Sequence, residues 1–178
     1  MIVCAGNNET FGFALPIGVG LVESAMNLTR LCLFDKPEFI LFVGSAGSYG
    51  KHETFEIIES KTSANIELGF LDNRGYTPMD NVVSSQVQGV KDVMVNSSNY
   101  ITTSEKAMEQ FRSLGMGIEN MEFFSVMRIA QEFEIPAGGV FCITNYCDAN
   151  AHRDFVANHD KAKQLLFEHL QKRGLNHV

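Results

Sequence analysis

Short apolar runs alternate along this chain with stretches of helical spacing, and this alternation constrains the fold more than any other feature. The run at residues 39–43 has five consecutive apolar residues and lies between Pro37 and Gly44. Such a short, uninterrupted run is typical of a strand that is covered on both faces. Strands that alternate with helices predict an α/β fold with a parallel or mixed sheet. We therefore expect one α/β domain over residues 1–178, with a twisted mixed β-sheet flanked by helices.

The other elements are predicted from the same two periodicities. Strands are expected at 2–5, 13–17, 39–43, 55–60, 90–95, 100–103 and 139–143. Helices are expected at about 18–34, 104–114, 121–133 and 152–173. Pro16 restricts its strand to an edge or a bulge, because proline has no N–H to donate to a neighbouring strand. Gly174 is placed to end the last helix in a left-handed conformation.

Composition excludes several classes of partner. The chain has 14 Lys and Arg against 21 Asp and Glu, which gives a formal net charge of −7. An acidic chain without a basic run argues against a nucleic-acid partner. No apolar stretch approaches the roughly 20 residues that span a membrane, and no basic segment opens a signal peptide, so we expect a cytoplasmic protein. The four cysteines form no CxxC pair and no zinc spacing with histidine, which predicts reduced thiols and no metal site.

A first candidate site is the small-residue turn Gly44-Ser45-Ala46-Gly47, expected directly after the buried strand. Open α/β sheets bind ligands at the carboxyl ends of their strands. Small residues let backbone N–H groups approach an anion or a sugar, and a serine hydroxyl adds a donor. The alternative is an ordinary structural turn. No lysine follows the turn, so a nucleoside triphosphate loop is not predicted.

A second candidate is the segment Asn120-Met121-Glu122-Phe123, where Asn120 is expected to cap a helix. Glu122 lies among apolar residues, and a carboxylate in apolar surroundings must find a donor. A ribose diol would supply two. The alternative is a carboxylate that only decorates the start of a helix, where the dipole favours it.

A third candidate is the segment 143–148, which places Asn145 at the end of a strand and Asp148 just beyond it. An asparagine amide offers both a donor and an acceptor, so it can contact two adjacent atoms of a heterocycle. The alternative is a turn residue that satisfies its own backbone. His152 and His159 follow this segment and could reach the same site.

In their order and spacing, these segments resemble the nucleoside phosphorylase family, which holds purine nucleoside phosphorylase, uridine phosphorylase and the methylthioadenosine/adenosylhomocysteine nucleosidases. Residues 17–20 resemble the family's entry into its first long helix, and 43–47 resemble its (T/V)GSAG turn. Residues 120–122 resemble its EMEAA segment, and 143–145 its ISD segment. The resemblance implies a phosphorylase/hydrolase-like fold and cleavage of the N-glycosidic bond of a purine nucleoside.

The resemblance also implies roles for individual residues. Glu122 would accept both ribose hydroxyls, Met121 would pack beneath the sugar, and Ser45 would contact phosphate or the attacking water. Asn145 stands where the family has an aspartic acid that acts at purine N7. An amide cannot transfer a proton, so we predict a preference for 6-oxopurine nucleosides, with Asp148 as the alternative acid. Phe123, Tyr146 and Phe155 are candidates for stacking on the base.

The predicted reaction is phosphorolysis, with inorganic phosphate as co-substrate, because Asn145 resembles the Ile-Thr-Asn of the 6-oxopurine phosphorylases. Two alternatives remain: a nucleosidase that uses water, and a non-catalytic nucleoside-binding protein. Phe42 stands where the hexameric phosphorylases have a phosphate-binding arginine, which favours the nucleosidase. Asn7, Glu9 and Ser45 are the candidates for the phosphate or water site. The resemblance further implies a homo-oligomer without a metal or an organic cofactor.

Overall fold

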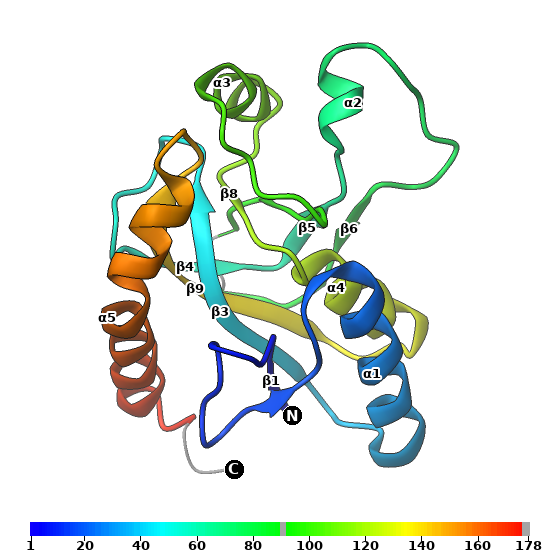
Figure 1. The fold of residues 1–178 in the computed structure, drawn as a ribbon. Helices are drawn as coiled ribbons and strands as arrows, with labels where there is room; N and C mark the ends of the chain where they lie inside the picture. Colours follow the sequence, from blue (N-terminus) through cyan, green and yellow to red (C-terminus); the bar gives the residue numbers. More distant parts are fainter. Residues whose placement is uncertain (90–91, 176–178) are drawn as a thin grey trace.

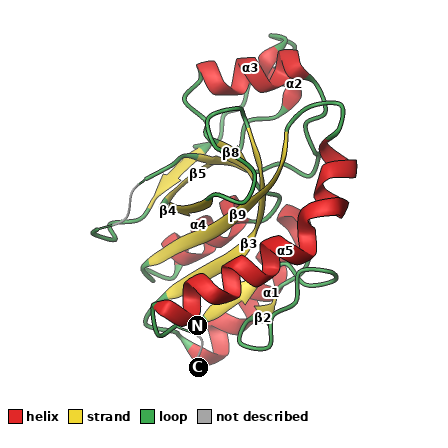
Figure 2. Ribbon diagram, turned by 90° about the vertical axis from the view of Figure 1, so that its left-hand side faces the viewer, coloured by secondary structure: helices red, strands yellow, loops and turns green. Residues whose placement is uncertain are grey.

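The structure is a computed structural model that describes residues 1–89 and 92–175, and it has a mixed β-sheet with helices on both faces (Figures 1 and 2). The helices are α1 (Gly20–Asp35), α2 (Leu68–Leu71), α3 (Glu105–Ser113), α4 (Phe123–Glu132) and α5 (Ala151–Lys172). The strands are β1 (Ile2–Cys4), β2 (Leu15–Pro16), β3 (Ile40–Ser48), β4 (Ile57–Ser60), β5 (Thr62–Ala64), β6 (Val82–Ser84), β7 (Val95–Asn96), β8 (Ile118–Glu119) and β9 (Ala137–Tyr146). The predicted α/β fold with a mixed sheet is confirmed. No helix within the described ranges is long and apolar enough to span a membrane.

Strand β3 is the centre of the sheet. It pairs in parallel with β9 along its whole length, from Ile40↔Ala137 to Ser48↔Tyr146. Its other edge is shared by two strands: β1 pairs in parallel with Leu41 and Phe42, and β8 pairs antiparallel with Gly47 and Ser48. Residues 43–46 therefore lie between the two partners, and this edge of β3 is open there. The candidate active site lies beside this open edge.

The side chains of β3 alternate between two core layers. Leu41 and Val43 pack with residues of α5, on the left of the sheet in Figure 1. Ile40 and Phe42 pack with residues of α1 and α4, on the right. Because both faces are covered, β3 carries an unbroken apolar run, as the sequence predicts. A third cluster, which includes Tyr49 and the α3 residue Phe111, covers the far end of the sheet.

Most predicted elements are present, but several boundaries differ. The predicted turn 44–47 is wrong, because these residues continue β3 and remain paired with β9. Strand β9 likewise extends through Asn145 to Tyr146. Residues 100–103 form a loop, not a strand. Of the strand expected at 90–95, only Val95 is in a strand, β7, and residues 90–91 lie outside the described ranges. Both β3 and β9 are longer than their apolar runs because neighbouring strands pair with them.

The helix predictions agree closely with the structure. Helices α1, α3, α4 and α5 lie within one or two residues of the expected ranges. Pro16 is in the edge strand β2, as expected for a residue that lacks a backbone donor. Gly174 has φ +68° just after α5, in the left-handed region where glycine is favoured.

Candidate active site

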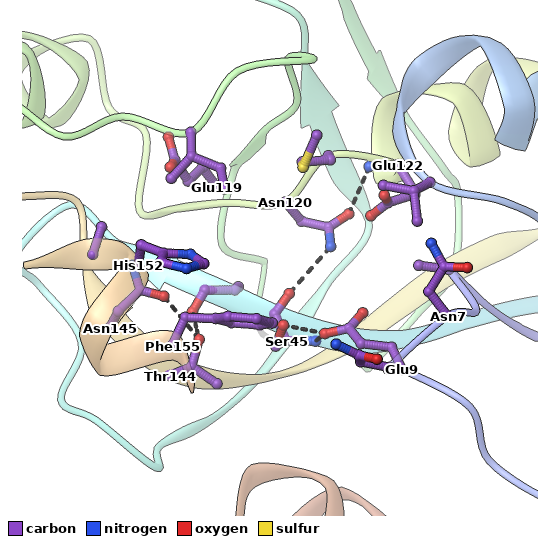
Figure 3. A pocket seen from close by; sticks show the side chains of 18 of the residues that line it. Asn7, Glu9, Ser45, Glu119, Asn120, Glu122, Thr144, Asn145, His152 and Phe155 are labelled. Atoms are coloured by element: carbon purple, nitrogen blue, oxygen red, sulfur yellow. Dashed lines mark hydrogen bonds between the residues drawn. The ribbon is translucent and has the colours of Figure 1, made fainter. Parts of the chain in front are cut away.

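A cavity of about 310 Å³ lies beside the open edge of β3 (Figure 3). Its wall is built from the residues after β1, the end of β3, residues 119–122, the end of β9 and the start of α5. Val19 and residues 98, 100 and 101 complete it. Figure 3 places Glu9 and Glu122 toward one end and Asn145 and His152 toward the other. The cavity thus has two carboxyls at one end, and an amide, an imidazole and the carboxyl of Glu119 at the other (Figure 3).

Ser45 lies on the open edge of β3, so its backbone groups bond to side chains instead of a strand. Its N–H donates to Glu9 Oε1 at 2.9 Å, and its hydroxyl donates to the same oxygen. Its carbonyl accepts from Asn120 Nδ2 at 3.1 Å. A Cβ at Gly44 would lie 3.2 Å from Glu9 Oε2, so Gly44 makes room for this carboxyl without lining the cavity itself. Burial raises the pKa of Glu9, and the hydrogen bonds from Ser45 oppose the rise.

Asn120 caps the start of α4 with its side chain, although the helix begins at Phe123 with Glu122 in the N-cap position, two residues later than the sequence predicts. Its Oδ1 accepts from the N–H of Glu122 at 2.9 Å and from the N–H of Phe123 at 3.0 Å. With its Nδ2 on the carbonyl of Ser45, Asn120 ties the start of α4 to the edge of β3. The cap therefore fixes the position of Glu122 relative to Ser45.

Glu122 is only 3% exposed, although it lines the cavity. Its Oε1 accepts from the N–H of Gly20, at the start of α1, at 2.8 Å. Burial raises the pKa of Glu122 from 4.5 to about 7; the Gly20 hydrogen bond opposes this rise, and the nearby Glu9 carboxyl adds to it. Such a buried carboxyl interacts strongly with any hydroxyl donor that enters the cavity.

Asn145 lies at the other end of the cavity, with its amide oriented by neighbours. Its Oδ1 accepts from the Thr144 hydroxyl at 2.8 Å, and its Nδ2 donates to the Tyr146 carbonyl at 3.0 Å. An amide nitrogen carries two hydrogens, so one N–H of Asn145 has no partner among the described residues. Because Asn145 lines the cavity, this N–H is the hydrogen-bond donor that its amide can offer to a ligand there.

Among the other predicted residues, Asn7, Ala46, Gly47 and Met121 line the cavity. Phe123 and Asp148 do not. Phe123 is fully buried, and its ring packs against Phe42 and Phe141 in the core. Asp148 accepts from the N–H of Asn150 at 2.7 Å before α5, which is the role of a turn residue. The structure therefore places neither where it would contact a ligand in the cavity.

For stacking on a base, the structure distinguishes the three aromatic candidates. Phe155 lines the cavity, whereas Tyr146 and Phe123 do not. The Tyr146 hydroxyl donates to Glu53 at 2.6 Å. His152 also lines the cavity, whereas His159 does not. His159 lies one helical turn after Phe155 and forms a hydrogen bond with the Asn8 carbonyl.

Glu119 is a cavity residue that the sequence analysis did not identify. Its Oε1 accepts from the N–H of Thr102 at 3.0 Å, and its Oε2 accepts from the Tyr49 hydroxyl at 2.8 Å. Burial raises its pKa. Its location in the cavity depends on the pairing of the two-residue strand β8 with β3, and a strand this short has no detectable periodicity.

The electrostatic character of the cavity is acidic. Glu9, Glu119 and Glu122 line it, and none of the described lining residues is Lys or Arg. Over residues 1–89 and 92–175, no three His, Cys, Asp or Glu side chains gather as a metal-binding group. The side chains present are suited to hydrogen bonding with hydroxyl and N–H groups rather than to holding an anion.

Comparison with known proteins defines the family. A sequence profile of the phosphorylase superfamily matches residues 70–172, more than half of the chain. This protein belongs to the phosphorylase superfamily. A curated relative, the 5'-methylthioadenosine/S-adenosylhomocysteine nucleosidase of Haemophilus ducreyi, is 24% identical over 174 residues, which cover 83% of this chain and 73% of that protein.

Solved structures agree on the fold. A mutant of Helicobacter pylori MTAN with 5'-methylthioadenosine in the active site aligns with a TM-score of 0.82 and 18% identity, over 96% of this chain and 95% of that one. Futalosine hydrolase from Helicobacter pylori strain 26695, also a mutant, aligns with a TM-score of 0.81 and 19% identity, over the same shares of both chains. At such identities the likeness establishes the fold.

Proposed function

We propose that this protein is a purine nucleosidase, which cleaves the N-glycosidic bond with water. The observation that carries the proposal is the acidic cavity wall, with three glutamates and no Lys or Arg among its described residues. Phosphate sites commonly supply arginine, lysine or clustered backbone N–H groups. Phosphorolysis, predicted from the sequence, therefore has no support from the groups in the cavity. The relative from Haemophilus ducreyi, named as a nucleosidase, supports the hydrolytic alternative.

Glu9 is the proposed general base for the water. Its carboxyl lies in the cavity wall, and Ser45 donates to Oε1 through both its N–H and its hydroxyl. These contacts hold the carboxyl in one orientation and leave Oε2 on the side cleared by Gly44. A fixed, desolvated carboxylate accepts a proton from water more readily than an exposed one. Water that loses its proton to Glu9 would attack the anomeric carbon.

Glu122 is the proposed ribose anchor. It lines the cavity toward the same end as Glu9 (Figure 3), so a sugar bound at that end would be within reach of both carboxyls. The ribose gains oxocarbenium character as the bond to the base breaks, as in other glycoside hydrolysis. A carboxylate that accepts from ribose hydroxyls both orients the sugar and stabilises this positive charge.

Asn145 is proposed to contact the leaving base at the opposite end of the cavity. When the bond breaks, its electron pair moves onto the purine, and a donor at N7 or at a 6-oxo group stabilises this charge. The available N–H of Asn145 can make one such bond but cannot transfer a proton. A 6-oxopurine offers this N–H two acceptors, O6 and N7, whereas a 6-aminopurine offers only N7, so we expect a preference for 6-oxopurines.

The test is base release from a nucleoside panel, measured in phosphate-free buffer and again with inorganic phosphate. The panel contains inosine, guanosine, adenosine, 5'-methylthioadenosine, S-adenosylhomocysteine and futalosine. We expect equal rates in the two buffers and free sugar as the second product. Release that requires phosphate, with a sugar 1-phosphate as product, would show that the hydrolytic proposal is wrong. Tight nucleoside binding without turnover would support the non-catalytic alternative.

A variant series tests the role of Glu9 separately. We expect Glu9→Gln to lower kcat by about 10²- to 10⁴-fold, the usual contribution of a positioned general base. Glu132→Gln, which neutralises an exposed glutamate at the end of α4, is the matched control and should retain the rate of the natural protein. Equal rates in Glu9→Gln and the control would exclude Glu9 as the base.

A further inference from the structure

We infer that His159 and Lys163, on the inner side of α5, are positioning residues that hold the turn carrying Glu9 against Ser45. This inference rests on the proposed function, because it takes Glu9 as the group that activates water. Neither residue lines the cavity. Their influence on the reaction would pass through the Asn8 carbonyl, which both contact.

The contact has a clear geometry. His159 Nε2 lies 2.8 Å from the Asn8 carbonyl oxygen, and Lys163 Nζ donates to the same oxygen at 3.0 Å. A carbonyl oxygen can only accept, so His159 Nε2 must carry the hydrogen. The two lone pairs of one oxygen accommodate both donors. Nδ1 of His159 is buried without a hydrogen-bond partner among the described residues, so the ring's one hydrogen bond is the one to Asn8.

The turn at residues 6–9 needs such an anchor. Gly6 has φ +99° and Asn7 has φ +52°, both in the left-handed region, which glycine and asparagine adopt more readily than other residues. The Glu9 N–H closes the turn on the Gly6 carbonyl at 2.9 Å. Asn7 and Asn8 are both exposed, so packing contributes little to their order. The α5 donors are thus placed where the turn is otherwise weakly held.

The same two residues act on Glu9 through charge. Burial raises the pKa of the Glu9 carboxyl, whereas Ser45, His159 and Lys163 lower it. Two further titratable neighbours among the described residues are Glu122, whose own pKa is raised by Glu9, and the buried Cys4 thiol, whose pKa Glu9 also raises. His159 and Lys163 are thus the positive or potentially positive groups that favour the Glu9 carboxylate. Loss of either should make Glu9 harder to ionise.

Helix α5 also links the turn to the ligand end of the cavity. Phe155, which lines the cavity, lies one turn before His159, and their ring centroids are 4.9 Å apart. Residues three and four apart share one face of a helix, so Phe155, His159 and Lys163 form a row along α5. This row explains why a helix that supplies the cavity wall also holds the turn of the proposed base.

The experiment uses the full chain. Lys163→Met and His159→Leu each remove one hydrogen-bond donor to the Asn8 carbonyl. Lys163→Arg and His159→Gln each keep a donor at the same position. Lys161→Met is the matched control, because it removes the same charge from α5 and its Nζ lies over the Phe55 ring instead. Two readouts are needed: hydrogen exchange of the Glu9 and Ser45 amides, and kcat and KM for base release across pH.

We expect Lys163→Met and His159→Leu to speed exchange of both amides by about tenfold, because local opening of the turn becomes easier. We expect kcat to fall about 10- to 100-fold with little change in KM, since a displaced base loses its alignment while the other ligand contacts remain. In Lys163→Met the acid limb of the kcat profile should move to higher pH, because Glu9 has lost a stabilising positive charge. Lys163→Arg and His159→Gln should restore exchange and kcat.

Several results would overturn the inference. Unchanged amide exchange in both donor-removing variants would show that the contacts do not hold the turn. If the acid limb of the kcat profile were unchanged in Lys163→Met, the two residues would have only a general packing role. The same conclusion would follow if His159→Gln lost as much kcat as His159→Leu. Lys163 is partly exposed, so Lys163→Met keeps the test decisive if His159→Leu does not fold. If the natural protein releases no base from any nucleoside, the proposed function fails, and the exchange data alone decide the inference.

Discussion

Replacing Glu122 by glutamine should stabilise the protein at neutral pH while it lowers activity. Glutamine has nearly the same shape and keeps an oxygen that can accept from the N–H of Gly20, 2.8 Å away from Glu122 Oε1. What the substitution removes is a titratable carboxyl that is 3% exposed in the cavity wall. Its effect on stability therefore depends on pH, and the direction follows from the pKa.

Burial raises the pKa of Glu122 from 4.5 to about 7. Between these values the folded protein binds more protons than the unfolded chain, so the free energy of unfolding falls as pH rises through this window. Below pH 4.5 the carboxyl is protonated in both states and this loss is absent. Since one pKa unit corresponds to 1.36 kcal/mol, the full loss is about 3 kcal/mol above pH 7.

Urea denaturation of the natural protein and of Glu122→Gln at pH 5 and pH 8 measures this effect. We expect the difference in unfolding free energy between the two proteins to shift in favour of the variant by about 2–3 kcal/mol between these pH values. Glu132→Gln, an exposed carboxyl on the same helix, serves as the control and should show no such shift. Base release by Glu122→Gln should fall, because an uncharged amide stabilises the ribose cation poorly. A variant whose stability follows pH as the natural protein does would refute the argument that Glu122 is a buried, destabilised carboxyl.

Three further substitutions give independent tests. Asn145→Asp should raise the rate with adenosine relative to inosine, because an acid can protonate N7 whereas an amide cannot; an unchanged ratio in base-release assays would contradict this role. Gly139→Ala should lower stability by about 1–3 kcal/mol in thermal unfolding, since overpacking strains a filled core, and its Cβ would lie 2.6 and 2.7 Å from two phenylalanine rings; an unchanged melting temperature would count against this packing. Asn120→Ala should cost about 1–2 kcal/mol, because two amides at the start of α4 lose their acceptor, and Asn120→Asp, which keeps the acceptor, should recover most of that loss.

The candidate site was predictable from sequence wherever a residue type was unusual for its local element. Glu122 stands among apolar residues beside a helix cap, and a carboxylate in such a place needs a donor. Asn145 ends an apolar strand, and small residues at 44–47 allow close approach by other groups. Each of these signals is local, because it depends on a residue and its immediate neighbours. The cavity accordingly contains Ser45, Glu122 and Asn145.

Local patterns failed where pairing with distant strands determined the outcome. The segment 44–47 resembled a turn, but its parallel pairing with β9 keeps it extended. Phe123 directly follows the cavity residue Glu122 in the sequence, but its ring packs in the core. Asp148 follows Asn145 by three residues, but its carboxyl accepts a hydrogen bond within a turn. Glu119 is in a two-residue strand, where no period can be detected. Except for Asp148, whose partner Asn150 is two residues away, the deciding partner in each case lies far away along the chain.

By itself, the sequence determined the alternation of strands and helices, because burial on two faces and amphipathic spacing are written in short-range patterns. It also determined which polar residues stand at the ends of the strands and helices. Only the tertiary structure decided which of them meet. The open edge of β3 between β1 and β8 leaves the backbone of Ser45 to Glu9 and Asn120, and this gap exists only because two strands share one edge. The acidity of the cavity, on which the choice of water over phosphate rests, follows from that packing.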